Sequence, residues 1–142
     1  DRKTGAPAPT LLFRREALEK VGGFDPEIRL DDLLIELKIT YAGYYIDILP
    51  DILADYRMHP TNTYKNYRFM IENVLKTYEQ FTDHPAYNKV CAAYRNSMFL
   101  KCSDKDKQLA RELLRDIPFR YWGKKTLRGC LRLLTTNQKQ QS

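Results

Sequence analysis

Apolar residues recur every three or four positions through the second half of the chain, from residue 64 onward. This spacing is typical of helices that bury one face. Turn residues divide the pattern into four segments: 64–81, 87–102, 104–117 and 122–134. The run 103–106 resembles a capping box at the start of the third segment. We therefore expect a bundle of about four helices here.

The first part of the chain mixes shorter segments of two kinds. Apolar runs of strand length occupy 10–13, 44–48 and 52–59, whereas 14–21 and 31–42 carry apolar residues at helical spacing. We expect two or three short strands among these helices. The fold class predicted for the whole chain is therefore α+β and predominantly helical.

Two adjacent carboxylates, Asp31 and Asp32, mark the start of the second short helix. Gly22 and Gly23 close the helix before them, because glycine readily takes the left-handed conformation that follows a helix end. An aspartate at a helix start accepts a bond from the backbone, and the helix dipole favours its charge. The pair is therefore either a helix cap alone or a cap that also carries chemistry.

A second group of polar residues ends the segment 52–59. Period-two alternation would place Asp55, Arg57 and His59 on one face of a strand, and Pro60 keeps His59 extended. Such a face is either exposed to solvent or part of a site. With the two aspartates it forms the partial site that the sequence supports.

Charge and cysteine content narrow the class of protein. The chain has 142 residues and a net charge of +6, and after residue 114 Asp116 is the only acid. This imbalance favours an anionic partner. The three cysteines are widely spaced, which suits reduced thiols in a cytoplasmic protein. No apolar run reaches the ~20 residues that a membrane span needs.

The final segment, 120–134, is both basic and amphipathic. A helical wheel puts leucines on one side and Lys124, Lys125, Arg128 and Arg132 on the other. One interpretation is a helix that lies on an anionic membrane surface at the inner face of the membrane. The other is an ordinary surface helix with a solvated basic face.

Several familiar chemical motifs are absent from the sequence. It has no phosphate-binding glycine-rich loop, no HExxH, no GxSxG, no Cys/His ligand set and no DxD pair. No known nucleic-acid module emerges, because the basic residues are not interleaved with aromatics. We therefore expect no nucleic-acid partner.

Three phrases within residues 10–66 resemble the second half of the catalytic domain of family 2 glycosyltransferases, which have the GT-A fold. They are LFRREALEKVGGFD at 12–25, DDL at 31–33 and YRMHPTNT at 56–63. Their order and spacing make the resemblance more specific than any one phrase. Leu33 and Leu34 stand where the family often has Trp-Asp, and Asp31 replaces the usual Glu.

The resemblance implies an inverting enzyme that transfers a sugar from a nucleotide-sugar donor to a glycan or lipid-linked acceptor. Asp32 has the position of the general base, which takes the proton of the acceptor hydroxyl. The resemblance implies substrate-binding roles for Asp31, Arg57 and Asn62. It also implies that His59 approaches either a divalent metal, Mn²⁺ or Mg²⁺, for which neutral imidazole is a competent ligand, or the diphosphate of the donor.

The nucleotide-binding half of the family is not found in these 142 residues. We therefore expect a portion of a longer enzyme, inactive and without bound metal when isolated. Residues 1–63 would be the C-terminal part of a GT-A-type α/β domain, and 64–142 a helical extension.

Two further expectations concern partners. Strands without neighbours would leave exposed edges, which favours a homodimer of this chain. The alternative function is a non-catalytic helical interaction module that binds protein, a membrane surface or nucleic acid.

Overall fold

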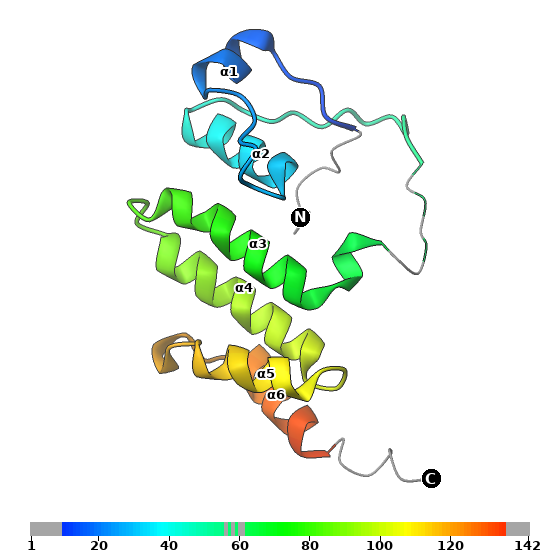
Figure 1. Ribbon diagram of the computed structural model, residues 1–142, viewed down its shortest axis with the longest axis vertical. Coiled ribbons are helices and arrows are strands. Elements are labelled where there is room, and N and C mark those ends of the chain that lie inside the picture. The colour runs from blue at the N-terminus through cyan, green and yellow to red at the C-terminus, as the bar shows by residue number, and fades with distance from the viewer. Residues whose placement is uncertain (1–9, 56, 58, 60–61, 136–142) are drawn as a thin grey trace. The chain divides into compact units, whose positions relative to one another are not determined.

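The computed structural model describes residues 10–55, 57, 59 and 62–135 (Figure 1). The chain divides into two compact units after Asn62, and each is described by itself. The first unit holds α1 (Arg15–Lys20) and α2 (Asp31–Tyr41). The second unit holds α3 (Tyr67–Tyr78), α4 (Tyr87–Cys102), α5 (Lys107–Arg115) and α6 (Lys124–Thr135), with short 3₁₀ turns η2 (Thr63–Lys65), η3 (Glu79–Phe81) and η4 (Phe119–Tyr121).

The predicted α+β fold is wrong, because the described residues form helices and no strand. The predicted strands 10–13 and 44–48, and the described part of 52–59, lack sheet structure. A strand is stable only when a neighbour pairs with its backbone, and these segments find none among the described residues. Their apolar side chains are exposed instead: Leu12 is 93% exposed and Ile52 94%. The described part of the chain therefore lacks the two or three strands expected of a GT-A-type portion.

Both helices of the first unit end at a glycine, as predicted for α1 from Gly22 and Gly23. Gly22 follows α1 with φ 77° and Gly43 follows α2 with φ 89°. At the end of α1 the amide of Gly23 donates to the Leu18 carbonyl at 2.9 Å, and at the end of α2 the amide of Tyr44 donates to the Ile39 carbonyl at 3.2 Å. These bonds satisfy carbonyls that a helix end leaves open, and only glycine takes this backbone conformation without strain.

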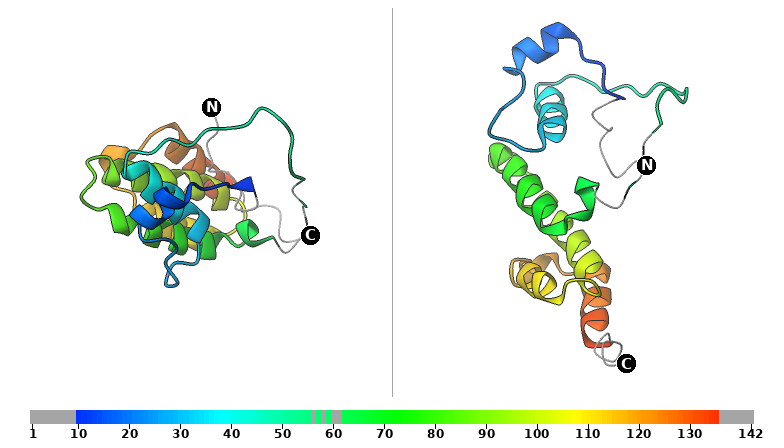
Figure 2. Two further views of the ribbon diagram at one scale, coloured as in Figure 1. Left: turned by 90° about the horizontal axis from the view of Figure 1, so that it is seen from above. Right: turned by 45° about the vertical axis from the view of Figure 1, so that its right-hand side comes forward.

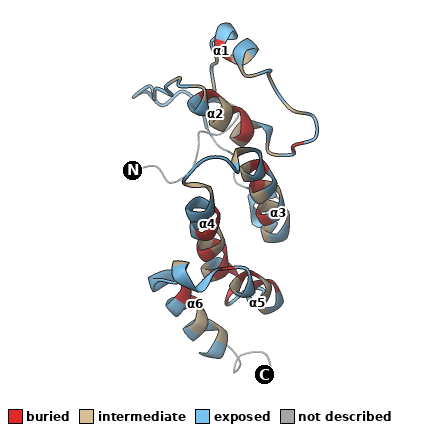
Figure 3. Ribbon diagram, turned by 90° about the vertical axis from the view of Figure 1, so that its left-hand side faces the viewer, coloured by how far each residue is buried: buried red, intermediate tan, exposed pale blue. Residues whose placement is uncertain are grey.

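In the second unit, α3, α5 and α6 all pack against α4. Figures 1 and 2 show α3 and α4 antiparallel, joined by a short turn. The predicted helix 87–102 is confirmed as α4, which contributes buried side chains from several turns, drawn red in Figure 3. The buried core consists of Ile71, Met98, Phe99, Cys102, Leu109, Ala110, Leu113 and Ile117.

The helix starts differ from the sequence expectation. The segment 64–81 is not one α-helix, because Asn66 caps α3 by accepting a bond from the amide of Phe69 at 3.1 Å. The predicted capping box at 103–106 is wrong. Asp106 caps α5, whereas Ser103 is buried at the end of α4 and donates to the Leu100 carbonyl.

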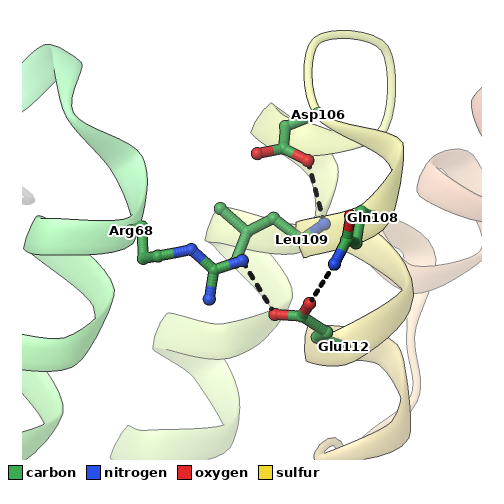
Figure 4. A network of polar contacts seen from close by, with 5 residues as sticks. All are labelled: Arg68, Asp106, Gln108, Leu109 and Glu112. Atoms are coloured by element: carbon green, nitrogen blue, oxygen red, sulfur yellow. Dashed lines mark hydrogen bonds and ion pairs between the residues drawn. The ribbon is translucent and has the colours of Figure 1, made fainter.

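An ion pair joins α3 to α5 at the surface of the second unit (Figure 4). Arg68 Nη2 lies 3.0 Å from Glu112 Oε2, and Gln108 Nε2 donates to the other carboxylate oxygen at 3.3 Å. Asp106 accepts from the amide of Leu109 at 2.9 Å nearby on α5. Both partners of the ion pair are partly exposed, so the pair fixes geometry more than it adds stability.

A buried polar network holds α6 against α4. The hydroxyl of Thr126, wholly buried, donates to Asn96 Oδ1. The amide of Asn96 donates to the carbonyls of Ala92 and Tyr121, each at 3.0 Å. The Thr126 hydroxyl also accepts from the amide of Gly123 at 3.0 Å, which satisfies an open group at the start of α6. The polar side chains buried between these helices are therefore hydrogen-bonded.

Close packing beside this network depends on a glycine. A Cβ atom at Gly129 of α6 would lie 2.3 Å from Cε1 of Phe99, a side chain that is wholly buried in α4. Real Cβ atoms do not approach other atoms so closely. The two helices therefore meet at the glycine backbone.

Among the described residues, none of the helices is both long and apolar enough to cross a lipid bilayer.

Candidate functional site

The two aspartates occupy the first turn of α2. The helix begins at Asp31, and its N-cap position is taken by Leu30, so the prediction that an aspartate is the N-cap is wrong by one residue. Asp31 Oδ1 accepts from the amide of Asp32 at 3.0 Å, and Asp32 Oδ1 accepts from the amide of Leu33 at 2.8 Å. The carboxylates thus bind amides that lack partners at a helix start, where the dipole favours negative charge.

The two carboxylate oxygens of Asp32 differ in their hydrogen bonding. The side chain is half-buried, whereas that of Asp31 is exposed. Its Oδ1 is held by the Leu33 amide, and Oδ2 makes no hydrogen bond or ion pair with any described residue. Leu34, Ile35 and Ile39 of the same helix are buried, which fixes the helix that carries the carboxylate. This arrangement suits proton transfer to Oδ2.

The second group lies in a turn at the end of the first unit. Asn62 is buried, and its amide accepts from the backbone N–H of His59 through Oδ1 and donates to the carbonyl of Arg57 at 3.4 Å. The backbone amide of Asn62 also donates to the His59 carbonyl at 3.3 Å. The polar atoms of Asn62 therefore hold the turn closed, a role that its sequence position did not suggest.

Arg57 and His59 present their side chains to solvent at this turn. The predicted alignment of Asp55, Arg57 and His59 on one strand face is wrong, because no strand forms there to impose the alternation. All three side chains are exposed. Residues 56, 58, 60 and 61 of the third phrase lie outside the described residues.

The structure brings Arg57, His59 and Asn62 together but does not join them to the aspartate pair. No hydrogen bond or ion pair connects Asp31 or Asp32 with the turn in the part of the chain that is described. The candidate site therefore consists of two local arrangements on separate segments of the first unit. Each arrangement is fixed by its own backbone bonds.

The metal site implied for His59 was tested against the ligand set. Across residues 10–55, 57, 59 and 62–135, no three His, Cys, Asp or Glu side chains lie close enough to hold an ion. Mn²⁺ and Mg²⁺ are bound mainly by several oxygen ligands, and one imidazole does not supply them. The described residues alone therefore do not fit the ion.

Displaced pKa values occur among cysteine and tyrosine side chains of the second unit. Burial raises the pKa of the Cys102 thiol to about 11, and it also raises the pKa values of Cys91, Tyr78 and Tyr94. A raised pKa keeps a thiol neutral and therefore unreactive. Cys91 and Cys102 are thus core residues, and we assign them no catalytic role.

None of the protein-family models, curated proteins or solved structures compared with this chain matches it. The resemblance to family 2 glycosyltransferases therefore rests on the three sequence phrases alone.

Proposed function

We propose that the chain supplies the general base and the acceptor side of an inverting family 2 glycosyltransferase. The observation that carries the proposal is the carboxylate of Asp32, in the first turn of α2. One oxygen is held by the Leu33 amide, and the other has no described partner. The role of general base is assigned to this carboxylate because DDL and the other two phrases resemble the family.

In the proposed reaction, Asp32 Oδ2 accepts the proton of an acceptor hydroxyl. The hydroxyl oxygen attacks the anomeric carbon of the donor sugar and forms the new glycosidic bond. The bond from that carbon to the nucleoside diphosphate breaks, and the diphosphate leaves with the electron pair. Attack opposite the leaving group inverts the anomeric configuration. A positioned base of this kind contributes about 10²–10⁴-fold to the rate.

The exposed turn at Arg57 and His59 supports a role next to phosphate. Arg57 is a permanent cation on a turn that Asn62 holds closed, and guanidinium binds phosphate oxygens in pairs. We assign Arg57 to the diphosphate of the donor, together with His59. Asn62 acts through the backbone and is therefore a positioning residue.

The nucleotide sugar itself would be held by a portion of the enzyme outside these 142 residues. Large apolar side chains are exposed throughout the extended segment 44–53: Tyr45, Ile46, Ile48, Leu49, Ile52 and Leu53. An apolar surface of this kind is typical of a region that contacts another part of a protein. We infer that the donor-binding portion covers it.

The test is the substitution Asp32→Asn in a protein that joins this chain to its donor-binding portion. We expect kcat for transfer to fall by about 10²–10⁴-fold, because an amide cannot accept the proton. The KM for the nucleotide sugar should change little, since Asp32 faces the acceptor. The rate is measured as release of nucleoside diphosphate and as formation of the glycoside.

Glu16→Gln is the matched control, because it also removes a carboxylate from the first turn of a helix in the first unit but has no assigned role. It should retain most of the activity. Transfer at the wild-type rate by the Asp32→Asn enzyme would contradict the assignment. It would show that another residue is the general base. No transfer by the unsubstituted protein would favour the alternative, a non-catalytic helical interaction module.

A further inference from the structure

Helix α6 presents its apolar residues on two separate sides. Thr126 and Gly129 are buried, with Cys130 and Leu133 partly buried beside them. The second side is exposed and consists of three leucines spaced four and three residues apart: Leu127 (61% exposed), Leu131 (62%) and Leu134 (76%). At 3.6 residues per turn they form one stripe along the helix, which we call the leucine stripe. Figure 3 draws the exposed residues of α6 in pale blue.

The basic residues of α6 also divide into two pairs. Lys125 Nζ donates to Ser97 Oγ, and Arg132 Nη1 donates to the Leu100 carbonyl at 3.3 Å, so both cations are engaged with α4. Lys124 and Arg128 are exposed and make no hydrogen bond or ion pair with any described residue. By helical spacing they lie next to the leucine stripe, on its side away from the core.

An exposed aromatic pair precedes the helix. Phe119 and Trp122 lie in and directly after η4 with their ring centroids 4.8 Å apart. The indole N–H of Trp122 is satisfied by the Ile117 carbonyl at 3.1 Å, so the ring needs no water partner. Trp122 lies just before the start of α6, and Leu127 lies one turn inside the helix. Side chains at these two positions commonly pack together. The aromatic pair therefore directly precedes the leucine stripe along the chain.

We propose that the leucine stripe, the aromatic pair and the cations Lys124 and Arg128 form a docking surface for an anionic lipid bilayer. The helix would lie in the plane of the interface, with its leucines among the upper acyl chains and its two cations among the headgroup phosphates. Tryptophan and tyrosine rings favour this same depth.

The positive charge of this end of the chain indicates that the docking surface binds an anionic bilayer. The chain carries a net charge of +6, and Asp116 is the only acid after residue 114, so an anionic surface is attracted to this end. A nucleic acid would use the cations but not the leucines, because phosphate backbones offer no apolar contact. A bilayer uses both. The inference is independent of the proposed glycosyl transfer and can be tested on the 142-residue chain alone.

Trp122 is the only tryptophan in the chain and serves as the probe. The chain is titrated with vesicles of phosphatidylcholine containing phosphatidylglycerol, and with vesicles of phosphatidylcholine alone. With the anionic vesicles only, we expect the emission of Trp122 to shift to the blue. Lipids brominated on their acyl chains should quench this emission when they are included in the anionic vesicles. High salt should weaken the binding.

Four single variants separate the two contributions. Leu131→Ser should weaken binding by about tenfold, since its contact with the acyl chains is lost. Leu49→Ser in the first unit is the matched control, at 60% exposure, and should bind as the wild type does. Lys124→Gln and Arg128→Gln should each weaken binding by about fivefold, the equivalent of one cation at an anionic surface.

All four substituted side chains are exposed, so the variants should fold as the wild type does. Circular dichroism measures whether they do. Two results would overturn the proposal. One is an unchanged Trp122 emission with anionic vesicles. The other is binding to duplex DNA that Leu131→Ser leaves unaffected, accompanied by no vesicle binding.

Discussion

Cys102 shows at the scale of one residue how the core of the second unit controls ionisation. Its side chain has no exposure to solvent. Burial is the main reason that its pKa rises to about 11, and the negative charge of Asp106 adds to the shift. A thiol in the unfolded chain ionises near pH 8.5. The folded state therefore holds a proton that the unfolded state loses between these two values.

We predict that the free energy of unfolding falls as the pH rises from about 8.5 to about 11. Below this window both states hold the proton, and within it the unfolded state binds fewer protons, so rising pH favours unfolding. The contribution of Cys102 over this window is about 3 kcal/mol. Urea unfolding at several pH values measures it.

Cys102→Ala should flatten this pH dependence while lowering stability at neutral pH, because it leaves a small cavity. Met98→Ala, at a buried position of the same helix that carries no titratable group, should lower stability but leave the slope unchanged. Equal slopes in the wild type and Cys102→Ala would contradict the prediction.

At the scale of one element, α5 depends on its cap. The helix has nine residues, too short to be stable by itself in water. Leu109, Ala110 and Leu113 bury one face of it, and Asp106 satisfies the amide of Leu109 at its start. Ser103, the predicted start, instead closes α4.

We predict that Asp106→Ala lowers the free energy of unfolding by about 1 kcal/mol, the usual cost of removing an N-cap side chain. Asp104→Ala is the matched control, since Asp104 is exposed and lies two residues away in the same turn. It should cost close to nothing. Thermal or urea unfolding of both variants measures the difference, and equal costs would show that the bond to Leu109 does not stabilise α5.

The helices could be predicted because their cause is local. Apolar residues three and four apart mark a helix face in any context, and Gly22 and Gly43 end helices through their own backbone freedom. The absence of strands among the described residues could not be predicted, because pairing depends on a neighbour that the sequence of one segment does not name. The residues of the candidate site were identifiable by type, but the backbone bonds of Asn62 depend on how the turn closes. A helical wheel likewise cannot tell which apolar side of α6 meets α4.

At the scale of the whole molecule, the first unit contains an apolar segment that is exposed to solvent. The segment 44–53 has no regular secondary structure, and six of its large apolar side chains are exposed. The homodimer was predicted from exposed strand edges, a reason that the structure does not support. Exposed apolar area supplies a different reason, since its burial is favourable.

We predict that the chain studied alone forms dimers through this segment at high concentration. Ile52→Lys should shift the population to monomer, because a charge opposes burial. Leu12→Lys is the matched control, as Leu12 is equally exposed but lies outside the segment. Light scattering over a concentration series gives the mass, and a monomer mass throughout would contradict the prediction.

The contact between Gly129 and Phe99 has a consequence for the surface on the opposite side of α6. Rotation of the helix by one residue about its own axis would bring the side chain of Arg128 or Cys130 against the Phe99 ring, where only a hydrogen atom fits. The rotational setting of the helix is therefore unique. The direction in which Leu127, Leu131 and Leu134 face is determined by a residue that has no side chain and takes no part in their surface.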